Sequence, residues 1–341
     1  MVTRHVSSAK AEGFRMPAEW EPHERCWMQW PFRSDFVWPD LARTQDAYAR
    51  VARAVSKFEP VTMIVPELAL ARAQSLCGES IDYLVMDLDD SWARDSGPIF
   101  VKRGGELAAS LFHFGAWGGK YPRVRNDAAV GHRVAEHLKI PTFTSNLFME
   151  GGGVHVDGEG TILTSESCVL NENRNPGITK AEAERLLCDA LGGEKVIWVP
   201  GDPADEETDG HIDGVACFVR PSVVLCEVGC RDFPDRYEVL QENVAALESA
   251  TDACGRNLEI LFIDEAYDAE SRSSRFSRSF VNFYIANGGI VFPRYGTRTD
   301  GLALDVVRRA FPDHAVEPVD VNDIAVAGGG IHCITQQQPR V

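Results

Sequence analysis

A cysteine that closely follows a run of glycines is a candidate nucleophile. Glycines occupy positions 328–330, and Ile331, His332 and Cys333 come next. Glycine lets the backbone bend sharply and lets a ligand come close to the thiol. A free thiol has a pKa of about 8.5, so an effective nucleophile needs a cationic neighbour or a cationic substrate that raises its thiolate fraction. The alternative, equally compatible with these residues, is a packed cysteine beside a histidine that caps a strand.

An acidic loop supplies a candidate general acid and base. His211 lies two residues before Asp213, so both side chains point to the same face if the segment is extended. A histidine beside a carboxylate can donate and accept protons during a reaction. The alternative is a solvated acidic loop, because residues 205–207 are also acidic. His155, His211 and Asp213 could supply a metal site, but a catalytic cysteine makes a metal unnecessary, so we expect no metal and no cofactor.

Carboxylates and a tryptophan from two further loops suit a planar cation. Trp92 and Asp95 lie in the polar stretch 89–98, and Glu150 precedes three glycines in another loop. A guanidinium presents a rigid fork of N–H donors that carboxylates accept in pairs, and an aromatic face can stack on it. The plainer account pairs Asp95 with a surface cation, buries Trp92 in the core and gives Glu150 a role in a turn.

These residues together describe one reaction. Attack of a thiolate on a guanidinium carbon needs carboxylates that hold the N–H groups and a proton donor for the departing ammonia. We assign Asp95 and Asp213 to the first role and His211 to the second. Water then hydrolyses the covalent thiouronium on Cys333, with His211 acting as the base.

Five helix-then-strand units must position these loops. The apolar pattern predicts helices at 41–58, 127–138, 179–191, 236–250 and 301–311, strands at 61–65, 141–144, 196–199, 258–263 and 315–319, and an extra strand at 83–86 in the first unit. The polar stretches 89–97, 150–157, 205–214 and 328–335 hold the residues discussed above, and the fourth unit contributes 282–289. Arranged in a ring, five such units bring their loops to one central mouth. The sequence therefore predicts a single α/β domain over residues 1–341 with pseudo-fivefold symmetry.

The composition limits the classes of partner that the protein is expected to bind. The net charge of -17, from 51 acidic and 34 basic residues, argues against a nucleic-acid surface and suits a small cationic ligand. No run approaches the roughly 18 apolar residues that span a bilayer, and the polar N-terminus lacks the apolar core of a signal peptide. We therefore expect a cytoplasmic protein without a membrane partner. Nine scattered cysteines suit reduced thiols, and the sequence leaves the oligomeric state open, a homodimer included.

The chain resembles the agmatine deiminases, within the guanidino-group-modifying (pentein) superfamily whose five ββαβ blades form a pseudo-symmetric propeller. The resemblance covers nearly the full length and rests on MPAEWEPHE at 16–24, WARDSGP at 92–98, AWGGKY at 116–121, EGG at 150–152, TDGHID at 208–213, NFYIAN at 282–287 and HCITQQ at 332–337. It implies hydrolysis of agmatine to N-carbamoylputrescine and ammonia, with Glu150 as a further active-site carboxylate. It also implies that Trp92 lines the guanidinium pocket and that Glu207 faces the far end of the substrate.

Some segments depart from the family pattern. Gly115 and Gly330 stand where the family usually has asparagine, and the segment 227–233 is shortened. The segment 271–280 carries Arg272, Arg275 and Arg278, and a cation in the mouth would favour a guanidino compound with a carboxylate. Free or peptide-terminal arginine is therefore the nearest alternative substrate. A non-enzymatic binding protein with the same fold is a more distant alternative, because such a protein would lack the thiol and its histidine partner.

Overall fold

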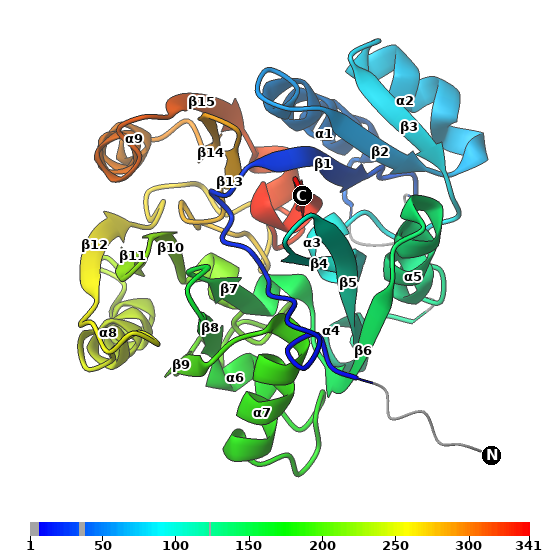
Figure 1. The fold of residues 1–341 in the computed structure, drawn as a ribbon. Coiled ribbons are helices and arrows are strands. Elements are labelled where there is room, and N and C mark those ends of the chain that lie inside the picture. Colours follow the sequence, from blue (N-terminus) through cyan, green and yellow to red (C-terminus); the bar gives the residue numbers. More distant parts are fainter. Residues whose placement is uncertain (1–6, 34–37, 123) are drawn as a thin grey trace, which may run out of the picture.

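Five small sheets surround a common centre in the computed structural model, which describes residues 7–33, 38–122 and 124–341 (Figure 1). In each sheet an antiparallel pair of strands is followed by a helix and then by a third strand parallel to the second. This ββαβ order recurs in all five sheets, so the predicted pseudo-fivefold α/β propeller is confirmed.

Four blades are continuous in sequence. The second blade comprises β4 (Ile99–Arg103), β5 (Glu106–His113), α5 (Asp127–Leu138) and β6 (Thr142–Phe148), and the third comprises β7 (Val154–Val156), β8 (Thr161–Ser165), α7 (Lys180–Leu191) and β9 (Lys195–Val199). The fourth comprises β10 (Ala216–Arg220), β11 (Val223–Val228), α8 (Pro234–Glu248) and β12 (Glu259–Asp264), and the fifth comprises β13 (Tyr284–Ala286), β14 (Gly289–Arg294), α9 (Thr299–Ala310) and β15 (Ala315–Asp320).

The first blade joins the two ends of the chain and thereby closes the ring. The C-terminal strand β16 (Thr335–Pro339) pairs antiparallel with β1 (His23–Gln29), and α1 (Leu41–Val55) leads to β2 (Val61–Val65). This blade is extended by η1 (Glu67–Ala69), α2 (Leu70–Cys77) and β3 (Ile81–Val85). Because Cys333 lies two residues before β16, this strand pairing also fixes the position of the thiol.

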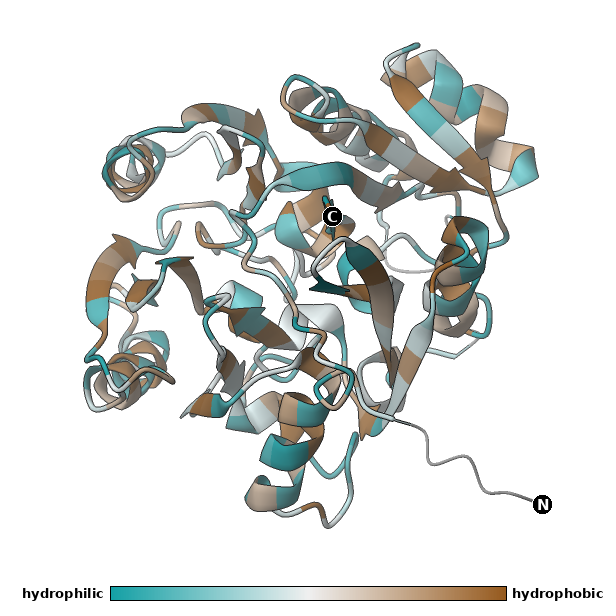
Figure 2. Cartoon of the chain, in the orientation of Figure 1, coloured by the Kyte–Doolittle hydropathy of each residue, from teal (hydrophilic) through white to brown (hydrophobic). Residues whose placement is uncertain are grey.

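Local sequence explains where the helices begin and end. Asp40 caps α1 by accepting from the Arg43 backbone N–H, and Thr179 caps α7 by accepting from that of Glu182. Gly192 ends α7 at a φ of 69°. Figure 2 shows polar and hydrophobic residues mixed on the large helices. Buried apolar side chains, such as those of β2, pack between these helices and the strands.

The predicted helices and strands are present with small shifts of their ends, but the sequence pattern gave no bounds for the two antiparallel strands that begin each blade. All five predicted helices are present, although the first ends at Val55 rather than at 58, and the fourth begins at Pro234. Helix α2 was not predicted, because it buries only Ala73 and Cys77 and so lacks a strong apolar stripe. Within the part of the chain that the structure describes, no helix is long and apolar enough to cross a membrane.

Candidate active site

Short helices at the ends of the blades gather the predicted residues at the centre of the ring. They are α3 (Ala93–Ser96), η2 (Gly151–Gly153), η3 (Ile212–Gly214) and η4 (His332–Ile334); further short helices are α4 (Ala116–Gly119), α6 (Glu166–Val169) and α10 (Asn322–Ala325). Helix α3 contacts both η2 and η4, and η2 contacts η3. Asp95 lies in α3, Glu150 precedes η2, His211 and Asp213 lie at η3, and Cys333 lies in η4. The structure therefore brings together all five residues that were predicted to be catalytic.

Gly152 marks the point on which three of these side chains converge. A Cβ atom at this glycine would lie 2.5 Å from His211 Nδ1, 2.9 Å from Asp213 Oδ2 and 3.0 Å from Asp95 Oδ1. The Gly152 backbone N–H donates a 3.0 Å hydrogen bond to Asp95 Oδ1. Only glycine permits this close approach, so the glycine run after Glu150 is required by the packing of the site.

His211 is held by carboxylates on two sides. Its Nε2 lies 3.1 Å from Glu150 Oε2 and its Nδ1 lies 3.8 Å from Asp95 Oδ1. Burial alone would lower the pKa of His211, but Asp95, Cys168 and Glu150 outweigh burial and raise it well above the usual value. The neighbouring carboxylates therefore favour the imidazolium form of the ring, which is a proton donor.

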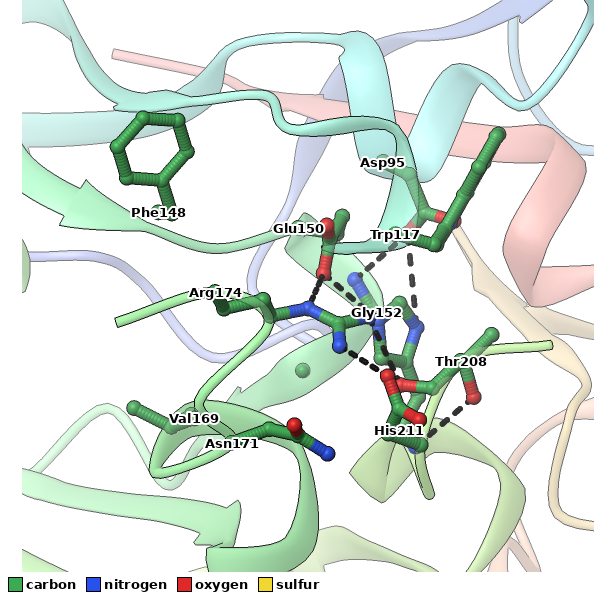
Figure 3. Close-up of polar contacts among 12 residues, drawn as sticks. Asp95, Trp117, Phe148, Glu150, Gly152, Val169, Asn171, Arg174, Thr208 and His211 are labelled. Atoms are coloured by element: carbon green, nitrogen blue, oxygen red, sulfur yellow. Dashed lines mark hydrogen bonds and ion pairs between the residues drawn. The ribbon is translucent and has the colours of Figure 1, made fainter. Parts of the chain in front are cut away.

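Arg174 completes the support of His211 and was not identified from the sequence. Figure 3 shows its guanidinium directed between Glu150 and the loop that carries His211. Arg174 Nε donates to Glu150 Oε2 at 2.8 Å, an Nη donates to the Thr208 carbonyl at 2.9 Å, and Asp209 accepts a further hydrogen bond. Burial would raise the pKa of Glu150, but His211 and Arg174 lower it, so Glu150 stays ionised.

Asp213 is held by a second buried network that passes through His332. His332 Nδ1 lies 2.8 Å from Asp213 Oδ2, and its Nε2 lies 2.8 Å from Glu19 Oε1, which also accepts from Arg94 at 3.1 Å. Burial and Arg94 lower the pKa of His332, but Glu19 and Asp213 raise it overall. Burial raises and His332 lowers the pKa of Asp213, with a net decrease. The alternative in which His332 caps a strand is therefore wrong, because its ring bridges two carboxylates.

Cys333 is buried between the Asp213 carboxylate and the Asn282 side-chain amide, whose Nδ2 donates to the sulfur. Its Sγ lies 3.6 Å from Asp213 Oδ2 and 3.3 Å from Asn282 Nδ2, and Asn282 Oδ1 accepts from the His332 backbone N–H at 3.0 Å. Burial, Asp213 and Asp95 raise the pKa of Cys333 well above that of a free thiol. Without a ligand, the group is therefore a neutral thiol.

The thiol opens onto two cavities. The narrow one has a volume of about 20 Å³ and is lined by Trp92, Asp95, Trp117, Tyr121, Glu207 and Cys333, among others. Trp92 is 7% exposed and stacks on Trp38, so it is both a core residue and a wall of this cavity. Trp117 Nε1 donates to Asp95 Oδ2 at 2.9 Å and thereby orients that carboxylate.

The wide cavity has a volume of about 480 Å³ and reaches the same thiol. Its lining includes Cys333, His211, Glu207, Arg275 and Arg278. Among the described residues, Arg278 forms no ion pair, its Nε is buried without a hydrogen-bond partner, and its guanidinium lies 5.9 Å from the centre of the Phe276 ring. The segment 271–280, which departs from the family pattern, thus lies at the mouth of the site, as the sequence suggested.

Two of the glycines before Cys333, Gly328 and Gly329, line both cavities. A Cβ at Gly329 would lie 2.3 Å from the Trp92 ring, and one at Gly328, whose φ is +92°, would lie 2.8 Å from Glu207 Cγ. A Cβ at Gly330 would lie 2.5 Å from Asn282 Oδ1. The backbone of this run therefore forms part of the site wall, which is a close approach of the kind predicted.

The structure does not bring together the three residues that the sequence offered as a metal site. Among the residues described, His155, His211 and Asp213 do not offer ligand atoms within 4.8 Å of one another as a group. His155 instead lies 3.5 Å from Glu19 Oε2. Glu19, His155 and His332 do lie close enough to share an ion, but the Arg94 guanidinium beside Glu19 opposes a second cation there.

The fold and the centre of the ring define the class of the protein. The solved structure of the Enterococcus faecalis agmatine deiminase has a TM-score of 0.94 and 35% identity to this chain, with 98% of each chain covered. A five-bladed ββαβ ring with a thiol, an imidazole and carboxylates at its centre is the architecture of a hydrolase that modifies guanidino groups.

Sequence comparison gives the family. The family model of the Porphyromonas-type peptidyl-arginine deiminases matches residues 15–339. The agmatine deiminase of Stutzerimonas stutzeri is 39% identical, with 99% of each chain covered, and that of Medicago truncatula is 38% identical, with 96% of this chain and 97% of the relative covered. The chain belongs to the Porphyromonas-type peptidyl-arginine deiminase family, and its resemblance to the agmatine deiminases is confirmed.

Proposed function

We propose that this protein hydrolyses agmatine to N-carbamoylputrescine and ammonia, with Cys333 as the nucleophile. The observation that carries the proposal is the narrow cavity. Cys333 and Asp95 lie in the same lining as a carboxylate from another loop, Glu207, with tryptophan and tyrosine rings around them. Agmatine has a guanidinium at one end, an ammonium at the other and an alkyl chain between, so its charges match such a cavity.

Binding of the guanidinium prepares the thiol. Asp95 and Asp213 accept its N–H groups, and the ring of Trp92 lies against its plane or alkyl stem. Burial raises the pKa of Cys333 most, and Asp213 and Asp95 raise it further. A cation placed between these carboxylates opposes their effect and lowers that pKa, so the thiol proton passes to solvent. The thiolate then attacks the guanidinium carbon and forms a tetrahedral adduct.

His211 serves both halves of the reaction. As an imidazolium it protonates the departing nitrogen, so that ammonia leaves and an alkylthiouronium remains on Cys333. The neutral ring then takes a proton from water, and the resulting hydroxide adds to the same carbon. Collapse of this adduct expels the thiolate and leaves the ureido product. Glu150 keeps the ring charged and oriented, because it contacts Nε2 at 3.1 Å.

The proposal also covers the extent and location of the enzyme. We infer one functional unit over residues 1–341, because the residues at the centre come from loops of several blades and from the C-terminal segment. We infer a cytoplasmic location, because a nucleophilic thiol must stay reduced and all nine cysteines are free.

The test is ammonia release from agmatine, arginine and butylguanidine, measured for wild type and for Glu207→Gln. Removing one partner of a desolvated charge pair costs about 2–5 kcal/mol, which corresponds to at least about thirtyfold in affinity. Glu207→Gln should therefore lower kcat/KM for agmatine by at least about thirtyfold and affect butylguanidine far less. Glu206→Gln, which removes the same charge from an exposed neighbour, is the matched control. A preference of wild type for arginine would refute the agmatine assignment.

A further inference from the structure

The carboxylate proposed to receive the substrate's ammonium already has a cationic partner in the ligand-free protein. Arg275 Nε lies 3.0 Å from Glu207 Oε1, while the Tyr121 hydroxyl donates to Glu207 Oε2. An Nη of Arg275 also donates to the Tyr121 hydroxyl at 3.0 Å, and the guanidinium lies 5.9 Å from the centre of the Tyr121 ring. Three loops that are distant in sequence therefore meet at one carboxylate.

This cluster of Arg275, Glu207 and Tyr121 lies where the two cavities meet. Glu207 lines both cavities, Arg275 lines the wide one, and Tyr121 lines the narrow one. The narrow cavity, at about 20 Å³, is much smaller than the wide one, at about 480 Å³. The ion pair therefore stands at the position where the far end of the substrate must be accommodated.

We propose that Arg275 occupies, in the ligand-free protein, the place at Glu207 that the distal ammonium of the substrate takes, so that a substrate is selected by its ability to displace Arg275. This inference rests on the proposed function. The two oxygens of the carboxylate have separate partners, so Tyr121 keeps Oε2 while Oε1 changes from one cation to the other. Glu207 thus has a cationic partner before and after binding.

Arg275 is suited to leave while its backbone stays in place. Its side chain is 39% exposed, so the guanidinium can move into water at little loss of burial. The loop is fastened on both sides, because Ser273 Oγ donates to the Val326 carbonyl at 2.7 Å and the Ser277 N–H donates to the Ala325 carbonyl at 3.0 Å. Displacement therefore requires a change in side-chain rotamer only.

As a consequence, the enzyme distinguishes guanidino compounds by the charge at the end of the substrate that lies away from the guanidinium. A diamine-type tail replaces one ion pair at Glu207 by another, so the displaced arginine leaves no buried charge unpaired. A neutral alkyl tail cannot replace the pair, and it gains nothing at this carboxylate. Arg275 is thus a specificity-determining residue, although it is not itself part of the lining of the narrow cavity that holds Asp95 and Cys333.

The test measures binding in the inactive Cys333→Ala protein by calorimetry, with agmatine and butylguanidine as probes. Arg275→Gln should tighten the Kd of agmatine by about two- to fivefold, the scale of a partly exposed ion pair. It should leave the Kd of butylguanidine within about twofold on the same scale. Arg278→Gln is the matched control, because it removes the same charge from the same loop and cavity without contacting Glu207. We expect that control to change agmatine binding by less than about twofold.

The outcomes separate this inference from the proposed function. Equal tightening in Arg275→Gln and Arg278→Gln would show a general electrostatic effect and overturn the displacement. Weaker agmatine binding in Arg275→Gln would show that the arginine closes over bound substrate, which also overturns it. Turnover of agmatine by wild type, measured separately, decides only the proposed function.

Discussion

Replacing His332 by glutamine should weaken catalysis without touching the substrate. His332 lies between two buried carboxylates, Asp213 and Glu19, each at 2.8 Å from one ring nitrogen. As an imidazolium it donates to both at once. Glutamine has one amide nitrogen, cannot carry a charge and cannot span both partners, so Asp213 loses its charged donor.

The expected loss follows from the burial of this pair. Both side chains are 4% exposed, so solvent does not screen the interaction. A hydrogen bond to a charged group contributes about 1.5–3 kcal/mol, and about 1.4 kcal/mol is a factor of ten in rate. If Asp213 must be ionised to hold the guanidinium, His332→Gln should lower kcat/KM by about 10- to 150-fold.

The pH dependence of kcat/KM distinguishes this role of His332 from a purely structural one, which would leave that dependence unchanged. His332 lowers the pKa of Asp213, so its loss raises that pKa. Activity requires the ionised carboxylate, and therefore the acidic limb of kcat/KM should move to higher pH. The lowered pKa also stabilises the fold above the unfolded pKa of about 3.9, and this stabilisation disappears as pH falls through the folded pKa. The variant should accordingly melt at a lower temperature at neutral pH.

The assay is ammonia release from about pH 5 to pH 9, a range that brackets the ordinary histidine pKa, together with thermal melting. His155→Gln is the control, because His155 lies 3.5 Å from Glu19 but forms no hydrogen bond to Asp213. The control should lose stability and keep the wild-type acidic limb. An acidic limb that stays in place in His332→Gln, or that moves equally in both variants, would refute the reasoning.

Five further results are expected. Cys333→Ala abolishes turnover and stays folded, and residual activity within about tenfold of wild type would contradict the role of this thiol. Dialysis of wild type against a strong chelator leaves its rate unchanged, and a loss of activity that zinc restores would contradict the metal-free assignment. His211→Ala slows both ammonia release and hydrolysis, and full-rate accumulation of the thiouronium by mass spectrometry would show that another acid serves the first step. Arg174→Gln lowers kcat and the melting temperature, because Glu150 loses a partner in a pair that is 0% and 1% exposed. Alkylation of ligand-free Cys333 by iodoacetamide should accelerate about tenfold per pH unit near neutrality, and a rate independent of pH would reveal a resting thiolate.

Local pattern predicted most of the fold, and long-range pairing accounts for what it missed. Each helix from 41–58 to 301–311 was identified by its apolar spacing, since that signal lies within one segment. The pairing of β16 with β1 brings together residues more than 300 positions apart, as His23 and Pro339 show. No local pattern encodes such a contact, so the closed first blade could only be expected from the symmetry of the other four.

The site was predictable where a loop follows a strand, and unpredictable where side chains reach between loops. Asp95, His211 and Cys333 were identified because their chemistry and glycine-rich surroundings are local. Arg174 lies in none of the polar stretches that the repeat singled out, and its role arises only because its guanidinium reaches Glu150 in another loop. The bond between Arg275 and Glu207 is similar: the sequence placed cations in the mouth, but a distance of 3.0 Å needs three dimensions.

The charge around the thiol explains why the cationic substrate itself promotes ionisation of Cys333. Burial, together with Asp213 and Asp95, raises the pKa of Cys333 and holds the thiol neutral, which would handicap a nucleophile that had to act on neutral compounds. A guanidinium between these carboxylates reverses their effect, so the thiolate forms only when its target is in place. The ureido product carries no charge at that end. It therefore cannot pair with the same carboxylates, the thiol pKa rises again, and the thiol regains its proton as the product leaves.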